Sequence, residues 1–255
     1  MKSTKKIMNL VATLCLLFVA SLRLSAQKSP AAKTIAPGFA VLELFTSEGC
    51  SSCPPAEALL EQIDRSSVGK PVYVLAYHVD YWDRQGWKDA FSDHRFSTRQ
   101  YQYSRNFSAQ VYTPQLVING TSEGIGSDEQ FVSRGIRQAL SAKAEATLAV
   151  HLKKAGDTGV LHYQIQGNTQ NAKLVVAVVQ KHAISHVLRG ENEGRTLSHA
   201  AIVRDLQTFT IDKDKTGDVT VRLPRQFNQT DWDAVSFLQD PQTGRIWAAS
   251  RADII

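Results

Sequence analysis

The sequence predicts an α/β domain followed by a mainly antiparallel β-sandwich domain. Between residues 37 and 145, nearly continuous apolar runs alternate with an amphipathic helical pattern, as in strand–helix–strand units with a parallel sheet. From residue 146 to residue 255, short alternating runs are separated by turns rich in Gly, Asp and Asn, which is typical of antiparallel β-structure. We therefore expect a domain boundary near residue 145.

Residues 1–26 have the three-part pattern of a secretory signal peptide. Three lysines precede the apolar run LVATLCLLFVA, and the segment ends in RLSA, which predicts cleavage after Ala26. The run is too short to span a membrane and no second run of membrane length follows, so we expect no membrane span. Residues 27–36 are small and polar and predict a flexible leader. The mature protein is therefore expected in the periplasm.

The charge balance argues against a nucleic-acid partner. The chain has 29 basic and 24 acidic residues, and the predicted signal peptide holds Lys2, Lys5, Lys6 and Arg23 but no acidic residue. Its removal leaves the mature chain nearly neutral, without the basic excess of nucleic-acid-binding domains.

The first half of the α/β domain predicts two buried parallel strands joined by a helix. Residues 38–45 (GFAVLELF) and 70–80 (KPVYVLAYHVD) are the apolar strands. Residues 50–66 (CSSCPPAEALLEQIDRS) have helical spacing, and a helix that begins at the cysteines tolerates Pro54 and Pro55 in its first turn. Strand, helix and strand in this order indicate a right-handed parallel unit.

The second half of this domain begins with an aromatic insertion at about residues 81–107, which is rich in Arg and predicted to be partly helical. Residues 113–126 (TPQLVINGTSEGIG) predict a hairpin with Asn119 and Gly120 in the turn. Residues 127–140 predict a closing helix.

The C-terminal domain is predicted from short β-type runs. They are residues 146–154, 160–167, 173–180, 218–224, 233–240 and 245–250. A polar segment interrupts them and is expected to be a loop that either contacts the first domain or a ligand, or is simply solvated; it carries His186, Arg189, Glu191, Asn192, Glu193, Arg195 and His199.

Cys50 and Cys53 form a C-x-x-C pair at the predicted helix start. The one other cysteine, Cys15, leaves with the signal peptide. A bridge between such near neighbours adds little chain-entropy stabilisation, so the pair is poorly placed as a brace, whereas its spacing suits thiol–disulfide exchange. The helix N-terminus is expected to lower the pKa of Cys50, while Glu48 and Glu57 act in the opposite direction.

Several motifs resemble a known family. FTSEGCSSCPPAE (45–57) and the hairpin at 113–126 resemble the thioredoxin superfamily. Together with HVDYWDRQGWKDAFS (78–92) and NEGRTL (192–197), they resemble more closely a bacterial family of secreted thioredoxin-like proteins catalogued as a domain of unknown function (number 1223). The resemblance covers nearly all of the mature chain and implies a thioredoxin-like domain over residues 37–145.

The resemblance also implies site residues. Cys50 is then the attacking and Cys53 the resolving cysteine, and Pro114 is a cis-proline that holds the Thr113 backbone beside the sulfurs, where an extended substrate can add as a strand. Ser51 and Ser52 stand where thioredoxins have Gly-Pro.

The expected function is that of a periplasmic thiol–disulfide oxidoreductase that acts on a protein thiol or disulfide client, uses a redox partner protein and needs no bound cofactor. An inert disulfide and metal binding are alternatives for the cysteine pair. Metal is disfavoured because closed thiolate sites need four ligands, although His78 and His94 are possible donors. The alternative function is a non-catalytic periplasmic binding or assembly module with a structural Cys50–Cys53 bridge.

Four further residues are candidates for lining the site. Glu43 interrupts the first strand and is either a buried proton acceptor for Cys53 or an outward-facing glutamate. His78 and Asp80 end a parallel strand, where α/β sheets bind ligands. Trp82 belongs to an aromatic group that forms either a substrate platform or the insertion's own core; the other members are Tyr77, Tyr81, Trp87 and Phe91.

Overall fold

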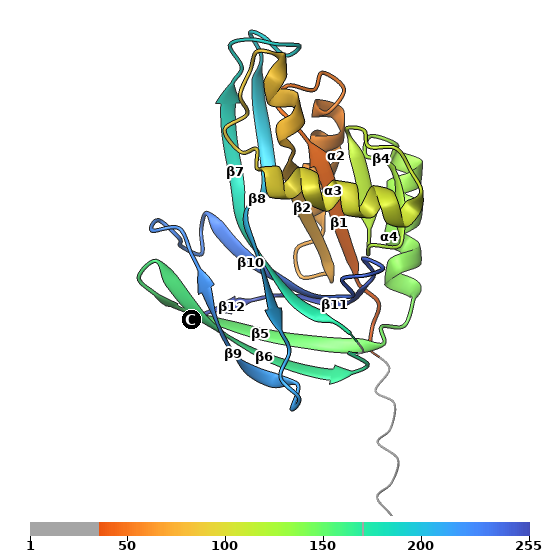
Figure 1. The fold of residues 1–255 in the computed structure, drawn as a ribbon, viewed down its shortest axis with the longest axis vertical. Helices are drawn as coiled ribbons and strands as arrows, with labels where there is room; N and C mark the ends of the chain where they lie inside the picture. Colours follow the sequence, from red (N-terminus) through yellow and green to blue (C-terminus); the bar gives the residue numbers. More distant parts are fainter. Residues whose placement is uncertain (1–35, 170) are drawn as a thin grey trace, which may run out of the picture. The chain divides into compact units, whose positions relative to one another are not determined.

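The computed structural model describes residues 36–169 and 171–255 (Figure 1). The predicted signal peptide and all but the last residue of the predicted leader lie outside these residues. The described residues belong to one compact unit. Among them, no helix is long and apolar enough to cross a membrane.

Two sheets and a few helices build this unit. The larger sheet has the strand order β11 (Ile246–Arg251), β10 (Trp232–Gln239), β7 (Lys173–His186), β8 (Thr196–Thr210), β2 (Val72–His78), β1 (Ala40–Thr46), β3 (Gln115–Ile118), β4 (Ser122–Ile125). The smaller sheet has the order β12 (Asp253–Ile254), β5 (Ala146–Ala155), β6 (Thr158–Gly167), β9 (Thr216–Arg222). The helices are α2 (Pro54–Ser66), α3 (His94–Phe107), α4 (Glu129–Ser141) and the 3-10 helix η1 (Asp80–Gln85).

The predicted elements of the first half are present. β1 and β2 are parallel and α2 connects them, while β3 runs antiparallel to both β1 and β4. Asn119 and Gly120 have φ values of 50° and 65° and are the central residues of the turn that Thr121 N closes by donating to Ile118 O. In Figure 1, α3 crosses in front of the strands β1 and β2.

The predicted fold class, a thioredoxin-like α/β domain followed by an antiparallel β-sandwich, is wrong. β8 pairs in parallel with β2 through Ala76 and Ile202, and β7 and β10 follow β8 in the same sheet. The larger sheet is therefore a mixed sheet of eight strands that contains segments from both sides of residue 145. Because β8 covers the outer side of β2, the sheet has no edge at that point.

Strand β7 explains why residues from both sides of residue 145 share one sheet, since both faces of this strand are buried. Val175, Ala177 and Val179 pack in the core that contains β1 and β2. The alternate residues Leu174, Val176 and Val178 pack in a second core, against the smaller sheet. Side chains alternate between the faces of a strand, so the continuous apolar run at 173–180 is that of a central strand with a layer on each side.

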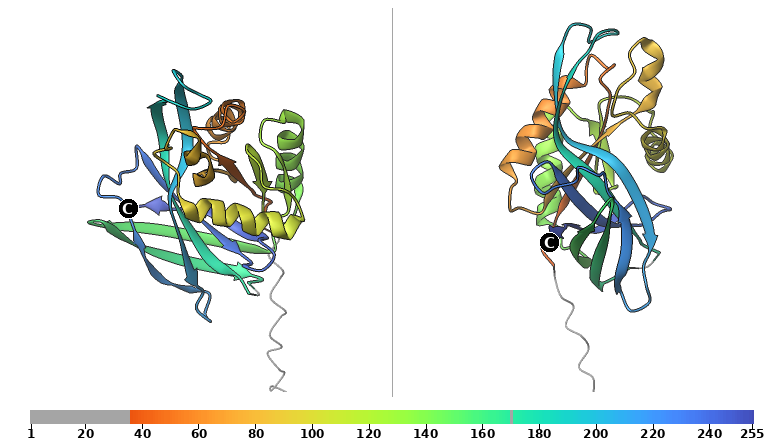
Figure 2. Two further views of the ribbon diagram at one scale, coloured as in Figure 1. Left: turned by 45° about the horizontal axis from the view of Figure 1, so that its top comes forward. Right: turned by 90° about the vertical axis from the view of Figure 1, so that its left-hand side faces the viewer.

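The predicted polar loop between residues 186 and 199 is present but shorter than expected, because both of its ends, with His186 and His199, are strand. β7 continues to His186 and β8 begins at Thr196, which leaves residues 187–195 as the connection. Figure 2 shows β7 and β8 as one long, curved hairpin with this connection at its tip. We call residues 187–195 the hairpin tip.

Candidate functional site

The cysteine pair lies at the beginning of α2. Cys50 and Cys53 form a disulfide with their Cα atoms 5.4 Å apart, and Cys53 is the N-cap residue of the helix. The prolines that follow occupy the first helical turn, where their missing N–H groups cost no helical hydrogen bond. Both cysteines are fully buried, whereas Ser51 and Ser52 between them are exposed.

Three residues expected near the cysteines do surround this turn. The Thr113–Pro114 peptide bond is cis, and Ser52 Oγ donates a hydrogen bond to Thr113 O at 3.4 Å. Trp82 Nε1 donates to Thr113 Oγ1 at 2.8 Å. A Cβ atom at Gly49 would lie 3.3 Å from Trp82 Cβ, so glycine lets the indole pack closely against the turn.

The hairpin tip covers the cysteine turn. Asn192 is buried, and its Nδ2 donates to Glu48 O at 2.8 Å and to Cys50 O at 3.0 Å. Glu191 Oε2 accepts hydrogen bonds from Ser51 N at 3.0 Å and Ser51 Oγ at 2.7 Å, and these bonds lower the pKa of the Glu191 carboxyl. The polar segment therefore contacts the N-terminal part of the chain, directly beside the buried Cys50.

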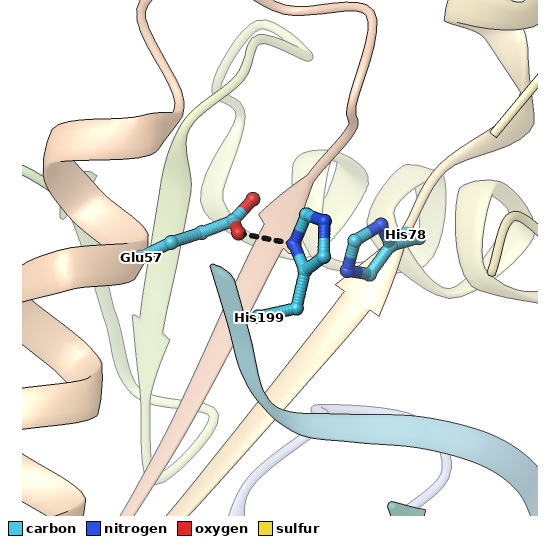
Figure 3. A group of neighbouring side chains, drawn as sticks. All are labelled: Glu57, His78 and His199. Carbon is cyan, nitrogen blue, oxygen red and sulfur yellow. Dashed lines mark hydrogen bonds and ion pairs between the residues drawn. The ribbon is translucent and has the colours of Figure 1, made fainter. Parts of the chain in front are cut away.

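Three buried side chains converge below the cysteine turn (Figure 3). Glu57 comes from α2, one turn after Cys53; His199 comes from β8; and His78 comes from the end of β2. Glu57 Oε2 and His199 Nδ1 are 2.6 Å apart, and Thr46 Oγ1 donates to Glu57 Oε1 at 2.5 Å. None of the three side chains is more than 8% exposed, so their interactions are shielded from water.

Two more carboxylates complete the group. Asp89 Oδ2 lies 2.7 Å from His78 Nδ1 and accepts a hydrogen bond from Glu48 N at 2.9 Å. Glu48 Oε2 accepts one from Trp87 Nε1 at 2.6 Å, and Glu48 Oε1 lies 3.4 Å from His199 Nε2. We call Glu48, Glu57, His78, Asp89 and His199 the histidine cluster.

The charges in the histidine cluster reinforce one another. Burial lowers the pKa of His199, but its close contacts with Glu48 and Glu57 and the charges of these carboxylates outweigh burial and raise the pKa to about 10. Burial raises the pKa of Glu57, but the hydrogen bond from His199 and the charges of His78 and His199 prevail, so the net shift is downward. Asp89 likewise has a lowered pKa, because its interactions with His78 and two backbone N–H groups exceed the effect of burial. Glu57 and His199 therefore form a buried ion pair at neutral pH.

Two polar atoms of the cluster have no hydrogen-bond partner among the described residues. They are His78 Nε2 and Glu48 Oε1, and both are buried. Buried polar atoms are usually paired, so unpaired ones in the same cluster need an explanation. In addition, one ligand atom each from Glu57, His78 and His199 lies within 4.8 Å of the others. The cluster thus has the donor types and the spacing of a metal site.

Comparison with known proteins assigns a family. Residues 41–239 match the family model described as "Protein of unknown function (DUF1223)". The chain belongs to the DUF1223 family. This confirms the resemblance of the sequence motifs to that family, whereas the thioredoxin superfamily is not confirmed. No curated protein matches the chain.

Two solved structures are similar to this DUF1223 chain. The crystal structure of a protein from Agrobacterium tumefaciens is 30% identical, with a TM-score of 0.64 over 87% of this chain and 96% of that chain. A domain of the outer membrane lipoprotein Omp28 from Porphyromonas gingivalis is 11% identical, with a TM-score of 0.25 over 44% of this chain and 98% of that chain. The second likeness is too low to bear on the fold.

Two of the candidate residues of the DUF1223 chain lie apart from the histidine cluster. Glu43 is buried and bonds to Arg99 Nε and Tyr103 Oη, both at 2.6 Å. Because side chains alternate along β1, Glu43 lies on the opposite face from Thr46, the residue that bonds Glu57. Asp80 accepts a hydrogen bond from Ser97 Oγ at 2.5 Å and lies 3.2 Å from His94 Nδ1. Neither residue contacts the cluster.

Most of the histidine cluster was missed by sequence reasoning. Asp89 was not singled out, and Glu48 and Glu57 were considered only as charges near Cys50. His199 was assigned to a loop, although Leu197, His199 and Ala201 are the buried positions of an alternating strand. That period of two is the signal in the sequence that predicts His199 to point inward.

Proposed function

We propose that the protein carries out thiol–disulfide exchange at the Cys50–Cys53 bridge, in the periplasm. The observation that carries this proposal is the position of the bridge at the beginning of α2, with the two exposed residues Ser51 and Ser52 between its cysteines. The positive end of the α2 dipole favours a thiolate on Cys50 once the bridge opens. An oxidising compartment is where such a bridge persists.

The exchange step uses the two sulfurs in sequence. A thiolate of a client protein attacks Cys50 Sγ, the Cys50–Cys53 bond breaks, and Cys53 leaves as a thiolate that takes up a proton. A second client thiolate then attacks the mixed disulfide and releases Cys50. The client is oxidised to a disulfide and the pair is reduced to two thiols. The reduced pair performs the reverse reaction on a client disulfide, and a redox partner protein restores the starting state.

Access to Cys50 requires the hairpin tip to move. The tip is held on the cysteine turn by the hydrogen bonds of Glu191 and Asn192. Hydrogen bonds of this kind contribute a net ~1 kcal/mol each, so a transient opening is well within thermal reach. The proposed enzyme is therefore closed at rest and reacts from an open state.

A trapping experiment tests the exchange. In a Cys53→Ser variant the resolving thiol is gone, so Cys50 is expected to accumulate as a mixed disulfide with its client in cells, visible on non-reducing gels. Cys50→Ser is the matched control and traps nothing through that position. A reduction potential below about −300 mV, together with no mixed disulfide, would contradict the proposal, because such a bridge resists reduction by physiological thiols.

The complete burial of both cysteines favours a second candidate, a non-catalytic binding or assembly module in which the bridge is structural. In that case a double variant, Cys50→Ser with Cys53→Ser, keeps partner binding and biological activity, although the protein unfolds at a lower temperature. Loss of activity in a double variant with unchanged melting temperature supports exchange instead.

A further inference from the structure

We propose that Glu57, His78 and His199 bind one divalent cation of the zinc type. Their three ligand atoms lie within 4.8 Å of one another, and the residues come from three different elements, α2, β2 and β8. The site is separate from the sulfurs and does not depend on the proposed exchange reaction.

His78 carries the argument. Its side chain has no exposed surface, and Nε2 has no hydrogen-bond partner among the described residues. Figure 3 shows one ring nitrogen of His78 directed toward His199. On the other side of the ring, Nδ1 lies 2.7 Å from Asp89 Oδ2. A carboxylate that holds one imidazole nitrogen fixes the tautomer and leaves the other nitrogen as a metal donor, which is the usual outer partner of a metal-binding histidine.

The contacts of Glu57 and His199 are compatible with an ion between them and His78. An ion with bonds of about 2.0–2.1 Å keeps tetrahedral neighbours about 3.3 Å apart. The contact between Glu57 Oε2 and His199 Nδ1, now 2.6 Å, therefore lengthens on binding, and the ion replaces the proton that holds the two atoms together. Thr46 Oγ1 continues to orient the other carboxylate oxygen of Glu57.

The charge of the cluster favours a cation. Its five members include three carboxylates but only two imidazoles, all of them buried. Arg204, which stacks over Phe91, supplies nearby positive charge but is itself exposed. A divalent ion compensates an excess of buried negative charge that would otherwise be unfavourable.

The donor set selects the type of ion. Two imidazole nitrogens and one carboxylate suit Zn²⁺ and related transition ions, whereas Ca²⁺ and Mg²⁺ prefer oxygen ligands alone. Three protein ligands leave the fourth position of a tetrahedral zinc ion open. Glu48 Oε1, which is buried without a hydrogen-bond partner and lies 3.4 Å from His199 Nε2, is suitably near to ligate there or to hold a water molecule on the ion.

The test is a metal titration of the untagged, exported protein with its disulfide intact, so that no thiolate competes. After treatment with a chelator, the protein is titrated with Co²⁺, whose visible absorption reports a four- or five-coordinate site, and then with Zn²⁺. We expect one equivalent of Co²⁺ to bind, Zn²⁺ to displace it, and bound Zn²⁺ to raise the melting temperature. A double variant, Cys50→Ser with Cys53→Ser, is expected to bind the same single equivalent.

Variants locate the ion. His78→Gln is expected to lower the affinity for Co²⁺ by on the order of 100-fold, and Asp89→Asn by on the order of 10-fold, as for a ligand and its outer partner. The matched control is His162→Gln, because His162 also pairs with an aspartate, at 2.7 Å, but is exposed on the smaller sheet. Near-UV circular dichroism checks that each variant is folded. The proposal is overturned if the wild-type protein takes up neither ion, or if folded His78→Gln binds Co²⁺ as tightly as the wild type.

Discussion

Two buried polar clusters lie on opposite faces of β1, and they differ in how completely their members are paired. The first, which we call the arginine cluster, consists of Glu43, Arg99, Tyr103 and Gln239. Arg99 donates to Glu43 Oε2 at 2.6 Å, to Gln239 Oε1 at 3.0 Å and to Tyr103 Oη at 3.1 Å. Tyr103 Oη donates to Glu43 Oε1 at 2.6 Å. Burial lowers the pKa of Arg99, but the charge of Glu43 outweighs it and raises this pKa well above its usual value.

The histidine cluster is built from similar groups but is incomplete. The arginine cluster has one carboxylate for one guanidinium, and none of its side-chain polar atoms lacks a partner. In the histidine cluster carboxylates outnumber imidazoles, and His78 Nε2 and Glu48 Oε1 have no hydrogen-bond partner among the described residues. Fully paired networks rigidify a core, whereas unpaired atoms in a buried cluster indicate a place where something else binds. We therefore interpret the arginine cluster as a structural brace of the core and the histidine cluster as a binding site.

The largest expected effect comes from breaking the brace. Arg99→Met leaves the Glu43 carboxylate buried without its partner, and loss of one member of a buried pair costs about 3–5 kcal/mol of unfolding free energy. Urea denaturation followed by tryptophan fluorescence measures this loss. Arg95 is the matched control, because it lies one turn earlier in α3 and pairs with Asp93 and Asp205, but its side chain is 48% exposed.

Arg95→Met is expected to cost less than about 1 kcal/mol, since exposed ion pairs contribute little. An equal loss in Arg95→Met and Arg99→Met would mean that the brace owes its stability to general packing of α3 and not to the buried pair.

The second prediction concerns stability at the histidine cluster in the absence of divalent ions. His78→Gln removes the hydrogen bond to Asp89, whereas Nε2 has no hydrogen-bond partner to lose. The substitution is therefore expected to lower the free energy of unfolding by only about 1–2 kcal/mol. Urea denaturation in the presence of a chelator measures this loss, which is then compared with that of Arg99→Met. If His78→Gln destabilises the metal-free protein as much as Arg99→Met, both clusters are structural braces.

Local patterns in the sequence predicted the strands around the site but not the sheet that joins them. The runs at 38–45 and 70–80, the hairpin at Asn119–Gly120 and the helix start after Cys53 each depend on neighbouring residues, and each is present. The parallel pairing of Ala76 with Ile202 depends on residues far apart in the chain. No local pattern specifies that pairing, so the sequence alone suggested two separate sheets.

The candidate site divides in the same way. Cys50, Cys53 and the Thr113–Pro114 bond are recognisable from adjacent residues. The histidine cluster is assembled from α2, the turn before it, β2, the segment after η1 and β8, and His199 joins the other members only through the long-range pairing of β8. A charged residue beside an apolar run looks the same in sequence whether it faces solvent or a buried imidazole.

The third prediction addresses the hairpin tip. Asn192→Ala removes two buried hydrogen bonds, to Glu48 O and Cys50 O, each with a net contribution of ~1 kcal/mol. The open state is then more populated, and the rate at which dithiothreitol reduces the Cys50–Cys53 bridge is expected to rise about 10-fold or more. Thiol alkylation followed by mass spectrometry measures the rate. Glu193→Ala is the control, because Glu193 is exposed on the same tip, and it should leave the rate unchanged.

The smallest expected effect comes from Glu191→Ala. Glu191 also bonds the cysteine turn, through Ser51 N and Ser51 Oγ, but it is exposed, so water replaces these hydrogen bonds when the tip opens. The reduction rate is therefore expected to rise only about 2-fold, well below the effect of Asn192→Ala. The comparison separates buried from exposed contacts within one short segment. If Glu191→Ala accelerates reduction more than Asn192→Ala, the tip is held at its surface, and the burial of Asn192 does not control access to the disulfide.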